Sequence, residues 1–262
     1  MKKVFPIINY ILLALTGIFL IALQFKPWAW LFLVLGLLSL RLCQQKLARA
    51  LFLIYLSLAI LGLTPITTDI SYRHMLQMGL ALMLAVALPY FIARHIYKEK
   101  LIVFPWRLGR KWFKKEISYI LLTAVIAYFL LPFYLINTGA YLNWSVEPGL
   151  SSIIRLFIGT NALGIWDELF FICTVLGLLK KFMDFKYANI LQAVLFTSFL
   201  YELGFTSWGF VMIFLFAWLQ GLIFHKTHSL AYVITIHLTL DFILFLALIW
   251  AHHPGWLTIF VV

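Results

Sequence analysis

The chain has 262 residues, of which 65% are hydrophobic and only 11% are charged, and its mean hydropathy is +1.03. A soluble domain is about 25% charged and about 45–50% apolar, so this composition excludes a soluble globular enzyme, a disordered protein and a nucleic-acid-binding domain. We therefore attribute the net charge of +11 to basic residues gathered beside a membrane.

The apolar stretches predict a bundle of membrane-spanning helices. A bilayer core about 30 Å thick needs about 20 apolar residues per helix. In chain order the sequence predicts nine spans, at roughly 5–24, 28–42, 48–64, 74–93, 117–136, 152–179, 188–204, 208–224 and 229–250. Four of these are short, so one pair can instead form a re-entrant hairpin. We expect an all-α polytopic bundle with eight or nine transmembrane helices, and the first span is expected to be retained because no small-residue cleavage site follows it.

A basic, aromatic-rich segment lies between Arg94 and Glu116. Such a segment suits an anionic membrane surface, and we interpret it as an ordinary positive loop with a surface helix. Residues 1–116 are then N-terminal helices followed by this segment, and residues 117–250 form the core expected to carry the function, within one membrane domain. Cys43 and Cys173 are isolated, so neither a disulfide nor a thiolate metal site is expected.

The basic residues predict the orientation of the bundle. If the N-terminus lies inside, all but three of the 20 Lys and Arg residues fall on the inner side, the exceptions being Lys26, Arg73 and Arg155. The positive-inside rule then places the N-terminus in the cytoplasm. Compact loops and the lack of an organelle signal favour a bacterial plasma membrane.

Four of the nine acidic residues lie inside predicted spans, together with one histidine: Asp167, Glu168, Glu202, Asp241 and His237. A charged side chain at the bilayer centre costs at least about 2.5–3.5 kcal/mol, so such residues are usually functional and paired. At about 1.5 Å per residue, all five groups lie roughly 17–24 Å from the nearest inner basic residue, on three helices. His237 and Asp241 share a helix face, whereas the adjacent Asp167 and Glu168 point about 100° apart, so only one of them is expected to aim at a given centre.

Several functions use such a constellation. Carboxylates and a histidine bind divalent metals such as zinc, for which His237, Asp241 and Glu202 are the candidate ligands. They also relay protons or bind cations in transporters, and they activate water for hydrolysis. Buried hydrogen bonds that only join three helices are the structural alternative.

The order and spacing of these residues resemble the CAAX prenyl protease and bacteriocin-processing family, the type II CAAX proteases. That family carries Glu-Glu-x-x-x-Arg, then Phe-x-x-x-His, then His-x-x-x-Asn or His-x-x-x-Asp, each on its own helix. Asp167-Glu168 resembles the first motif, with Asp in place of the first Glu and Ile172 in place of the Arg, and His237 with Asp241 matches the third. The second motif falls in 195–205, where Phe205 stands at the histidine, and we expect Glu202 to supply the missing polar group.

This resemblance implies an intramembrane endopeptidase that cleaves a membrane-associated peptide or protein by carboxylate-activated water. Asp167 becomes the base, Glu168 a structural or second base, and His237 and Asp241 the pair that stabilises the developing oxyanion. Glu202 beside Asp167 would form an acid pair that shares a proton. Two alternatives stay open: a catalytically inactive family member that acts as a membrane binding, immunity or regulatory protein, and an ion-coupled transporter, although neither repeat symmetry nor paired broken helices are visible.

Overall fold

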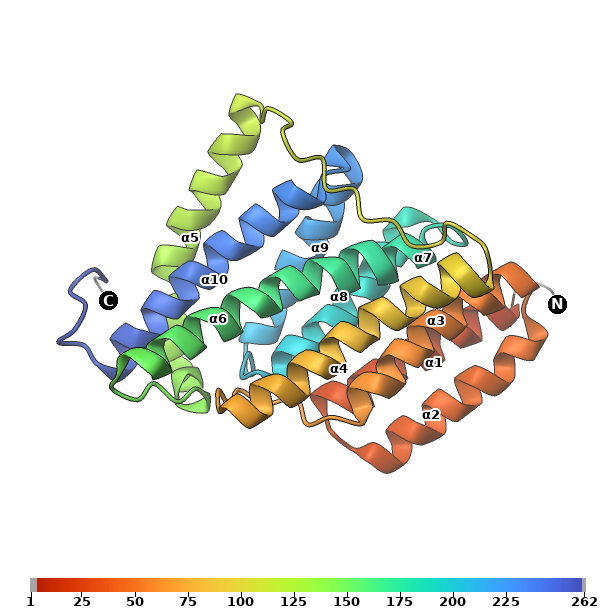
Figure 1. The fold of residues 1–262 in the computed structure, drawn as a ribbon, viewed down its shortest axis with the longest axis horizontal. Helices are drawn as coiled ribbons and strands as arrows, with labels where there is room; N and C mark the ends of the chain where they lie inside the picture. The colour runs from red at the N-terminus through yellow and green to blue at the C-terminus, as the bar shows by residue number, and fades with distance from the viewer. Residues whose placement is uncertain (1–3, 261–262) are drawn as a thin grey trace.

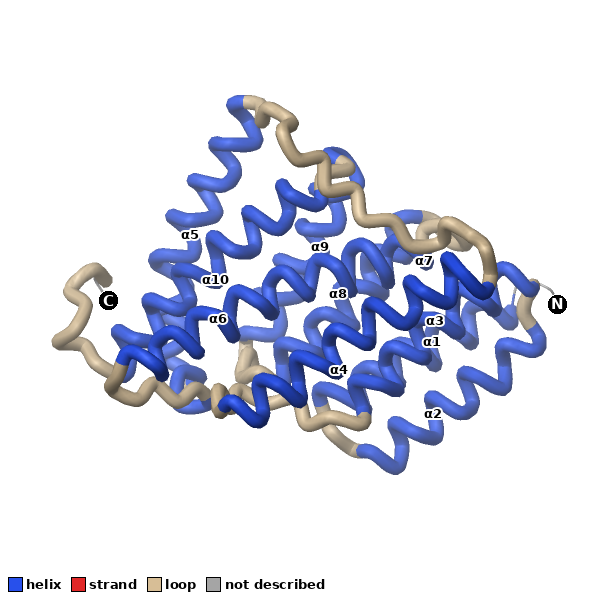
Figure 2. The backbone as a smooth tube through the Cα atoms, viewed as in Figure 1, coloured by secondary structure: helices blue, strands red, loops and turns tan. Residues whose placement is uncertain are grey.

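The computed structural model describes residues 4–260, which form a bundle of helices and contain no β-strand (Figures 1 and 2). Each predicted span corresponds to one helical rod, so the predicted all-α polytopic bundle is confirmed. The rods are α1 (Val4–Gly17) with η1 (Ile18–Ala22), α2 (Lys26–Ser39) with η2 (Leu40–Leu42), α3 (Gln45–Gly62), α4 (Tyr72–Phe91) with η3 (Ile92–Ile96), α5 (Lys114–Thr138), α6 (Leu150–Asp167) with η5 (Glu168–Leu176) and α7 (Gly177–Leu179), α8 (Phe185–Glu202), α9 (Gly209–Thr227) and α10 (Leu230–His252).

Six of these rods are long and apolar enough to cross a membrane: those over Gln45–Gly62, Tyr72–Ile96, Lys114–Thr138, Leu150–Leu179, Gly209–Thr227 and Leu230–His252. The first rod is apolar as well but shorter, over Pro6–Ala22. Large apolar side chains on the outside of α5, such as Leu121, Val125 and Phe129, are more than half exposed. In water these side chains would form an unfavourable surface, whereas in a bilayer lipid tails cover them. The chain is therefore an integral membrane protein.

The long rod of α6, η5 and α7 runs through the interior of the bundle (Figure 1). Its η5 segment packs against α4, α8, α9 and α10, and α10 in turn packs between α5 and α6. From Phe170 to Leu176 every side chain of this rod is buried. Any polar group in this part of the rod must therefore find its partner within the protein.

The basic segment between α4 and α5 forms no helix between Ile96 and Lys114, so the expected surface helix is not present. Instead the backbone of this segment forms hydrogen bonds with the first residues of α10. The backbone N–H groups of Leu230 and Ala231 donate to the carbonyls of Pro105 and Trp106, at 2.9 and 3.3 Å. The first N–H groups of a helix have no partner within that helix, so the extended backbone of this segment satisfies them.

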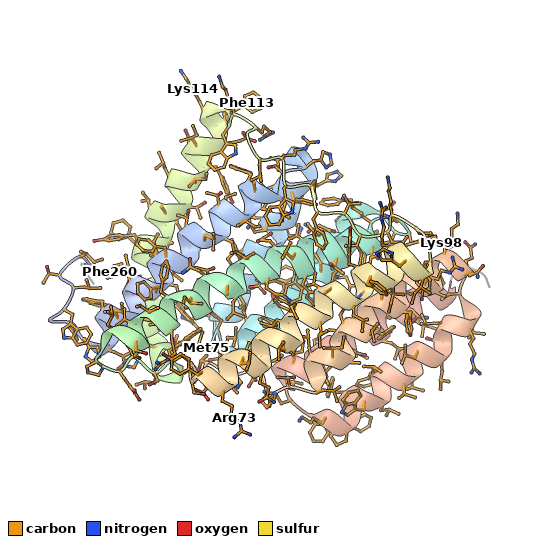
Figure 3. The ribbon with its side chains drawn as sticks, in the orientation of Figure 1. Arg73, Met75, Lys98, Phe113, Lys114 and Phe260 are labelled. Atoms are coloured by element: carbon orange, nitrogen blue, oxygen red, sulfur yellow. The ribbon has the colours of Figure 1, made fainter. Side chains whose placement is uncertain are left out.

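Several contacts bring the basic residues together at one end of the bundle, which we call the basic end. Arg49 at the start of α3 pairs with Glu99 at 2.6 Å, and Lys181 after α7 donates to the carbonyl of Lys100 at 3.0 Å. Figure 3 shows Arg73 and Lys98 at opposite ends of the α4–η3 rod. Arg49, Lys98, Lys100 and Lys181 therefore lie at this end of the bundle, and Arg73 lies at the other end.

Candidate functional site

Two adjacent buried carboxylates stand where the central rod changes its helical period. Asp167 is the last residue of α6, and Glu168 is the first residue of the π-helical segment η5. Both side chains are almost completely buried, at 1% and 0% exposure. A π-helix has more residues per turn than an α-helix, and such segments are frequent at functional sites.

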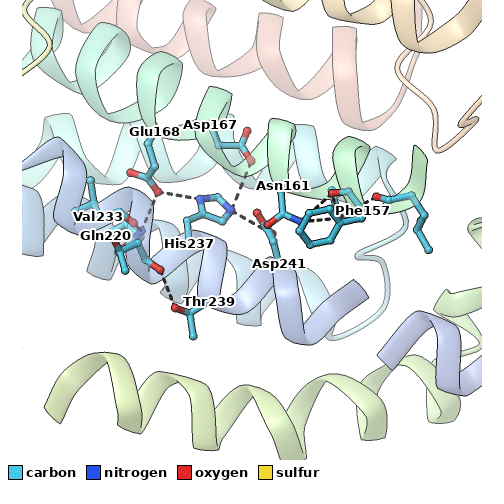
Figure 4. Close-up of polar contacts among 12 residues, drawn as sticks. Phe157, Asn161, Asp167, Glu168, Gln220, Val233, His237, Thr239 and Asp241 are labelled. Atoms are coloured by element: carbon cyan, nitrogen blue, oxygen red, sulfur yellow. Dashed lines mark hydrogen bonds and ion pairs between the residues drawn. The ribbon is translucent and has the colours of Figure 1, made fainter. Parts of the chain in front are cut away.

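Both carboxylates face one imidazole, that of His237 on α10 (Figure 4). Nδ1 of His237 lies 2.9 Å from Glu168 Oε1, within hydrogen-bonding distance. Nε2 lies 3.8 Å from Asp167 Oδ2 and 3.8 Å from Asp241 Oδ1. The expectation that only one of the adjacent acids aims at this centre is wrong, because the two ring nitrogens lie on different edges and each edge receives a different carboxylate.

Gly164 on α6 lets this cluster form, because it allows α6 and α10 to approach closely. A Cβ atom at this position would overlap Oδ2 of Asp241 and would lie 3.1 Å from Cδ2 of His237. The absence of a side chain at Gly164 therefore leaves room for the carboxylate of Asp241 in its present position.

Gln220 on α9 is a fifth member of the cluster, and the sequence reasoning missed it. Its Nε2 donates to Glu168 Oε1 at 2.8 Å and to the carbonyl of Val233 at 3.1 Å (Figure 4). The side chain is 1% exposed. An amide buried in an apolar helix needs a partner as an acid does, so a search for uncharged polar residues inside the spans would have found it.

Glu202 does not join the cluster, so its predicted position beside Asp167 is wrong. Its Oε1 accepts a hydrogen bond from Nε2 of Gln24, at 2.5 Å, in the connection between η1 and α2. The reason is the length of α8, which ends at Glu202 and is followed by a turn at Leu203 and Gly204. The carboxylate therefore lies at the end of the helix and reaches a loop, where it is partly exposed.

No imidazole from α8 reaches the site in the part of the chain that the structure describes. Phe205 lies after α8 and stacks on Tyr134, with ring centroids 5.7 Å apart. The α8 ring that faces His237 is that of Phe196, at 5.9 Å between centroids. Ile172, which stands at the position of the motif's arginine, is fully buried among apolar side chains.

A cavity of about 560 Å³ adjoins the cluster. Asp167, His237 and Asp241 belong to its lining, whereas Glu168 does not and therefore lies behind the wall. Most of the lining is apolar and comes from α5, α6, α9 and α10. Ile126 of α5 and Leu215 of α9 line the cavity and are each 51% exposed, so the cavity reaches the lipid-facing side between these two helices.

The cluster is rich in acid and has few donors. Among residues 4–260, no Lys or Arg forms an ion pair with its carboxylates. Four of its buried oxygen atoms lack a hydrogen-bond partner: Asp167 Oδ1, Glu168 Oε2, Gln220 Oε1 and Asp241 Oδ2. Within the same residues, no three His, Cys, Asp or Glu side chains are placed to hold a metal ion, and Glu202 bonds Gln24 instead of joining the other two candidate ligands. Zinc binding stays a prediction, which metal analysis of the purified protein would test.

Comparison with known proteins identifies the segment that builds this site. Residues 149–243 match the family model described as type II CAAX prenyl endopeptidase Rce1-like. The matched segment runs from the start of α6 into α10 and includes all five members of the cluster. No curated protein and no solved structure matches the chain. The resemblance inferred from the motifs is thus confirmed for the segment that carries them, which matches the model of Rce1-like type II CAAX prenyl endopeptidases.

Proposed function

We propose that the chain is an intramembrane endopeptidase that hydrolyses a peptide bond in a membrane-associated substrate. One observation carries this proposal: an imidazole held by Glu168 on one edge faces two aspartates across its other edge, at the wall of a cavity. A buried acid, a second acid and an oriented imidazole are the groups that general acid–base hydrolysis needs.

In the proposed reaction Asp167 accepts a proton from a water molecule in the cavity. The water oxygen bonds to the carbonyl carbon of the substrate, and the electron pair of the C=O double bond moves onto the carbonyl oxygen. His237, with a proton on each ring nitrogen, keeps both protons, forms a hydrogen bond to Glu168 through Nδ1–H and directs Nε2–H toward this oxyanion. The electron pair of the oxyanion then re-forms the C=O double bond as the C–N bond breaks, and the proton held by Asp167 passes to the leaving amine. Asp241 stabilises the positively charged imidazole during these steps.

The cavity supports a substrate that is presented from the bilayer. Its lining is mostly apolar, and it reaches the lipid-facing side between α5 and α9. An apolar segment or a lipid-modified peptide can therefore enter without crossing a charged surface. We further propose that the membrane is a bacterial plasma membrane and that the basic end of the bundle faces the cytoplasm, as the positive-inside rule requires.

Cleavage by purified protein in proteoliposomes tests the proposal. The probe is a short peptide that ends in a prenylated Cys followed by three residues and that carries a fluorophore and a quencher on either side of the expected bond. We expect Asp167→Asn and His237→Gln each to lower the rate by at least about a hundredfold, because general acid–base groups contribute about 10²–10⁴.

Glu202→Gln is the matched control, because it neutralises an intramembrane acid that lies outside the cluster. It should leave the rate within about twofold of the wild type, as expected for a side chain away from the reacting atoms. Cleavage that survives both Asp167→Asn and His237→Gln would refute the proposal.

A second candidate function is that of a family member without proteolysis, which binds a membrane protein or lipid-linked peptide in the same cavity. The observation that favours it is Phe196, because α8 presents an apolar ring to His237 where a second imidazole would help to activate water. This candidate predicts that the wild type binds the prenylated probe without cleaving it, and that Asp167→Asn binds it equally well.

A further inference from the structure

We propose that Gln220 is a positioning residue. Its amide fixes Glu168 and the turn of α10 that carries His237, so that Nδ1 of the imidazole is held on Glu168 and Nε2 faces the cavity. The consequence for catalysis rests on the proposed function, whereas the consequence for the imidazole does not.

The amide of Gln220 links two elements of the site. Both hydrogens of Nε2 are used, one on Glu168 Oε1 at 2.8 Å and one on the carbonyl of Val233 at 3.1 Å. Val233 lies four residues before His237, so it is on the same face of α10 and one turn away. One side chain of α9 therefore links the acid of η5 to the turn of α10 next to the imidazole.

The surroundings of Glu168 are the second argument. This carboxylate is fully buried, and among residues 4–260 only two side chains lie within hydrogen-bonding distance of it, those of His237 and Gln220. No Lys or Arg of the described chain forms an ion pair with it, and Ile172, one turn further along η5, is apolar and fully buried. A buried carboxylate with few donors keeps its orientation only through those donors. Without Gln220, a single hydrogen bond from His237 would have to fix both groups.

The chemistry of the imidazole is the third argument. Which ring nitrogen carries a proton is set by the partner of the other nitrogen. Here Oε1 of Glu168 accepts from Gln220 and lies 2.9 Å from His237 Nδ1, which favours a proton on Nδ1. Since Glu168 lies behind the cavity wall and the other nitrogen faces the two aspartates, the amide of Gln220 sets which edge of the ring can meet a substrate.

The test uses the full-length protein in detergent micelles with ¹⁵N-labelled histidine, and the His237→Gln variant assigns the signals of His237. In the wild type we expect Nδ1 of His237 to carry a proton. In Gln220→Leu we expect the Nδ1 signal to shift or to split into more than one state. Gln220→Glu is measured too, because it keeps the size of the side chain and exchanges the donating amide for a carboxyl group.

The matched control is Gln192→Leu. Gln192 is another fully buried amide, which bonds the carbonyl of Ala217 at 2.8 Å and Asn189 at 3.1 Å and so joins α8 to α9 without a hydrogen bond to Glu168 or His237. Its loss should lower the melting temperature and leave the His237 signals in place. On the prenylated probe, Gln220→Leu should lower kcat by about 10- to 100-fold with KM nearly unchanged, as a misplaced catalytic group does.

Two results would overturn the inference. One is a wild-type His237 whose Nδ1 carries no proton, which needs no variant to observe. The other is a folded Gln220→Leu or Gln220→Glu variant whose His237 signals are the same as those of the wild type. If the wild type cleaves no probe but the His237 signals respond as expected, the proposed function fails and the positioning role stands.

Discussion

Replacing Gly164 by alanine tests the site without removing any of its chemical groups. The new Cβ atom would overlap Oδ2 of Asp241 and would come within 3.1 Å of Cδ2 of His237. Because the obstructing oxygen is the far end of a side chain, we expect the carboxylate of Asp241 to rotate away while the helices stay in place. Gly159 on the same helix is the control, because a Cβ there would meet only Cγ2 of Ile70, at 3.9 Å.

The two variants should separate stability from activity. Gly→Ala within a helix gains up to about 1 kcal/mol, whereas crowding a packed interior costs about 1–3 kcal/mol. Gly159→Ala should therefore be as stable as the wild type or more so, and Gly164→Ala should lose no more than about 2 kcal/mol, since one side chain can yield. A catalytic group moved by about 1 Å can cost about a hundredfold in rate, and we expect a loss of this order for Gly164→Ala only.

The assay compares the cleavage rate of the prenylated probe with the melting temperature in the same detergent. The double variant Gly164→Ala with Asp241→Asn should lose little more activity than either single variant, because both changes act on the same carboxylate. If the two glycine variants cleave at equal rates, or if Gly164→Ala loses activity only in proportion to unfolding, the reasoning about this close approach is refuted.

Two further predictions concern the fold and its orientation. Trp166→Phe removes the buried hydrogen bond from Nε1 to the carbonyl of Leu82, at 2.7 Å; it should lower the free energy of unfolding by about 1 kcal/mol, measured as a lower denaturation midpoint, and an unchanged midpoint would show that this bond between α6 and α4 contributes nothing. Lys111→Cys and Leu142→Cys, each in a Cys43→Ser background, place thiols in the basic segment between η3 and α5 and in the short helix η4 (Ala140–Asn143) after α5. In intact cells a membrane-impermeant maleimide should label only Leu142→Cys, and the opposite pattern would reverse the proposed orientation.

The membrane fold could be predicted from the sequence because few rules govern it. Apolar runs about 20 residues long specify the rods. Each run forms a helix because the bilayer core offers no hydrogen-bond partners to an open backbone. The same rule found most of the cluster, since Asp167, Glu168, His237 and Asp241 stand in apolar surroundings where an acid needs a partner. The structure brings these four together, although the sequence predicts only one of Asp167 and Glu168 at this centre.

The remaining features depend on local backbone geometry or on tertiary contacts. Glu202 was misplaced because its depth depends on the residue at which α8 ends, and helix ends are poorly marked in an apolar sequence. Asp167 and Glu168 both approach the imidazole of His237. This depends on the residue at which the π-helix begins and on the position of the imidazole, and neither can be read from the sequence. Gln220 carries no charge, so a search for acids and histidines inside the spans does not find it. The segment before α5 has aromatic and basic residues that suit a surface helix, but the start of α10 holds its backbone extended.

Glu168 and the two aspartates differ in their position relative to the cavity, and this difference indicates different roles. A buried ionic group that only joins helices is stable when each of its polar atoms has a partner. Apolar residues often join helices equally well, because burying them carries no cost of desolvating a charge. Glu168 lies behind the wall and has two close polar neighbours on Oε1, while its Oε2 has no partner. Asp167 and Asp241 line the cavity, their nearest approach to the imidazole is 3.8 Å, and one oxygen of each has no partner. The two aspartates are therefore the carboxylates of the cluster that a water molecule in the cavity can reach.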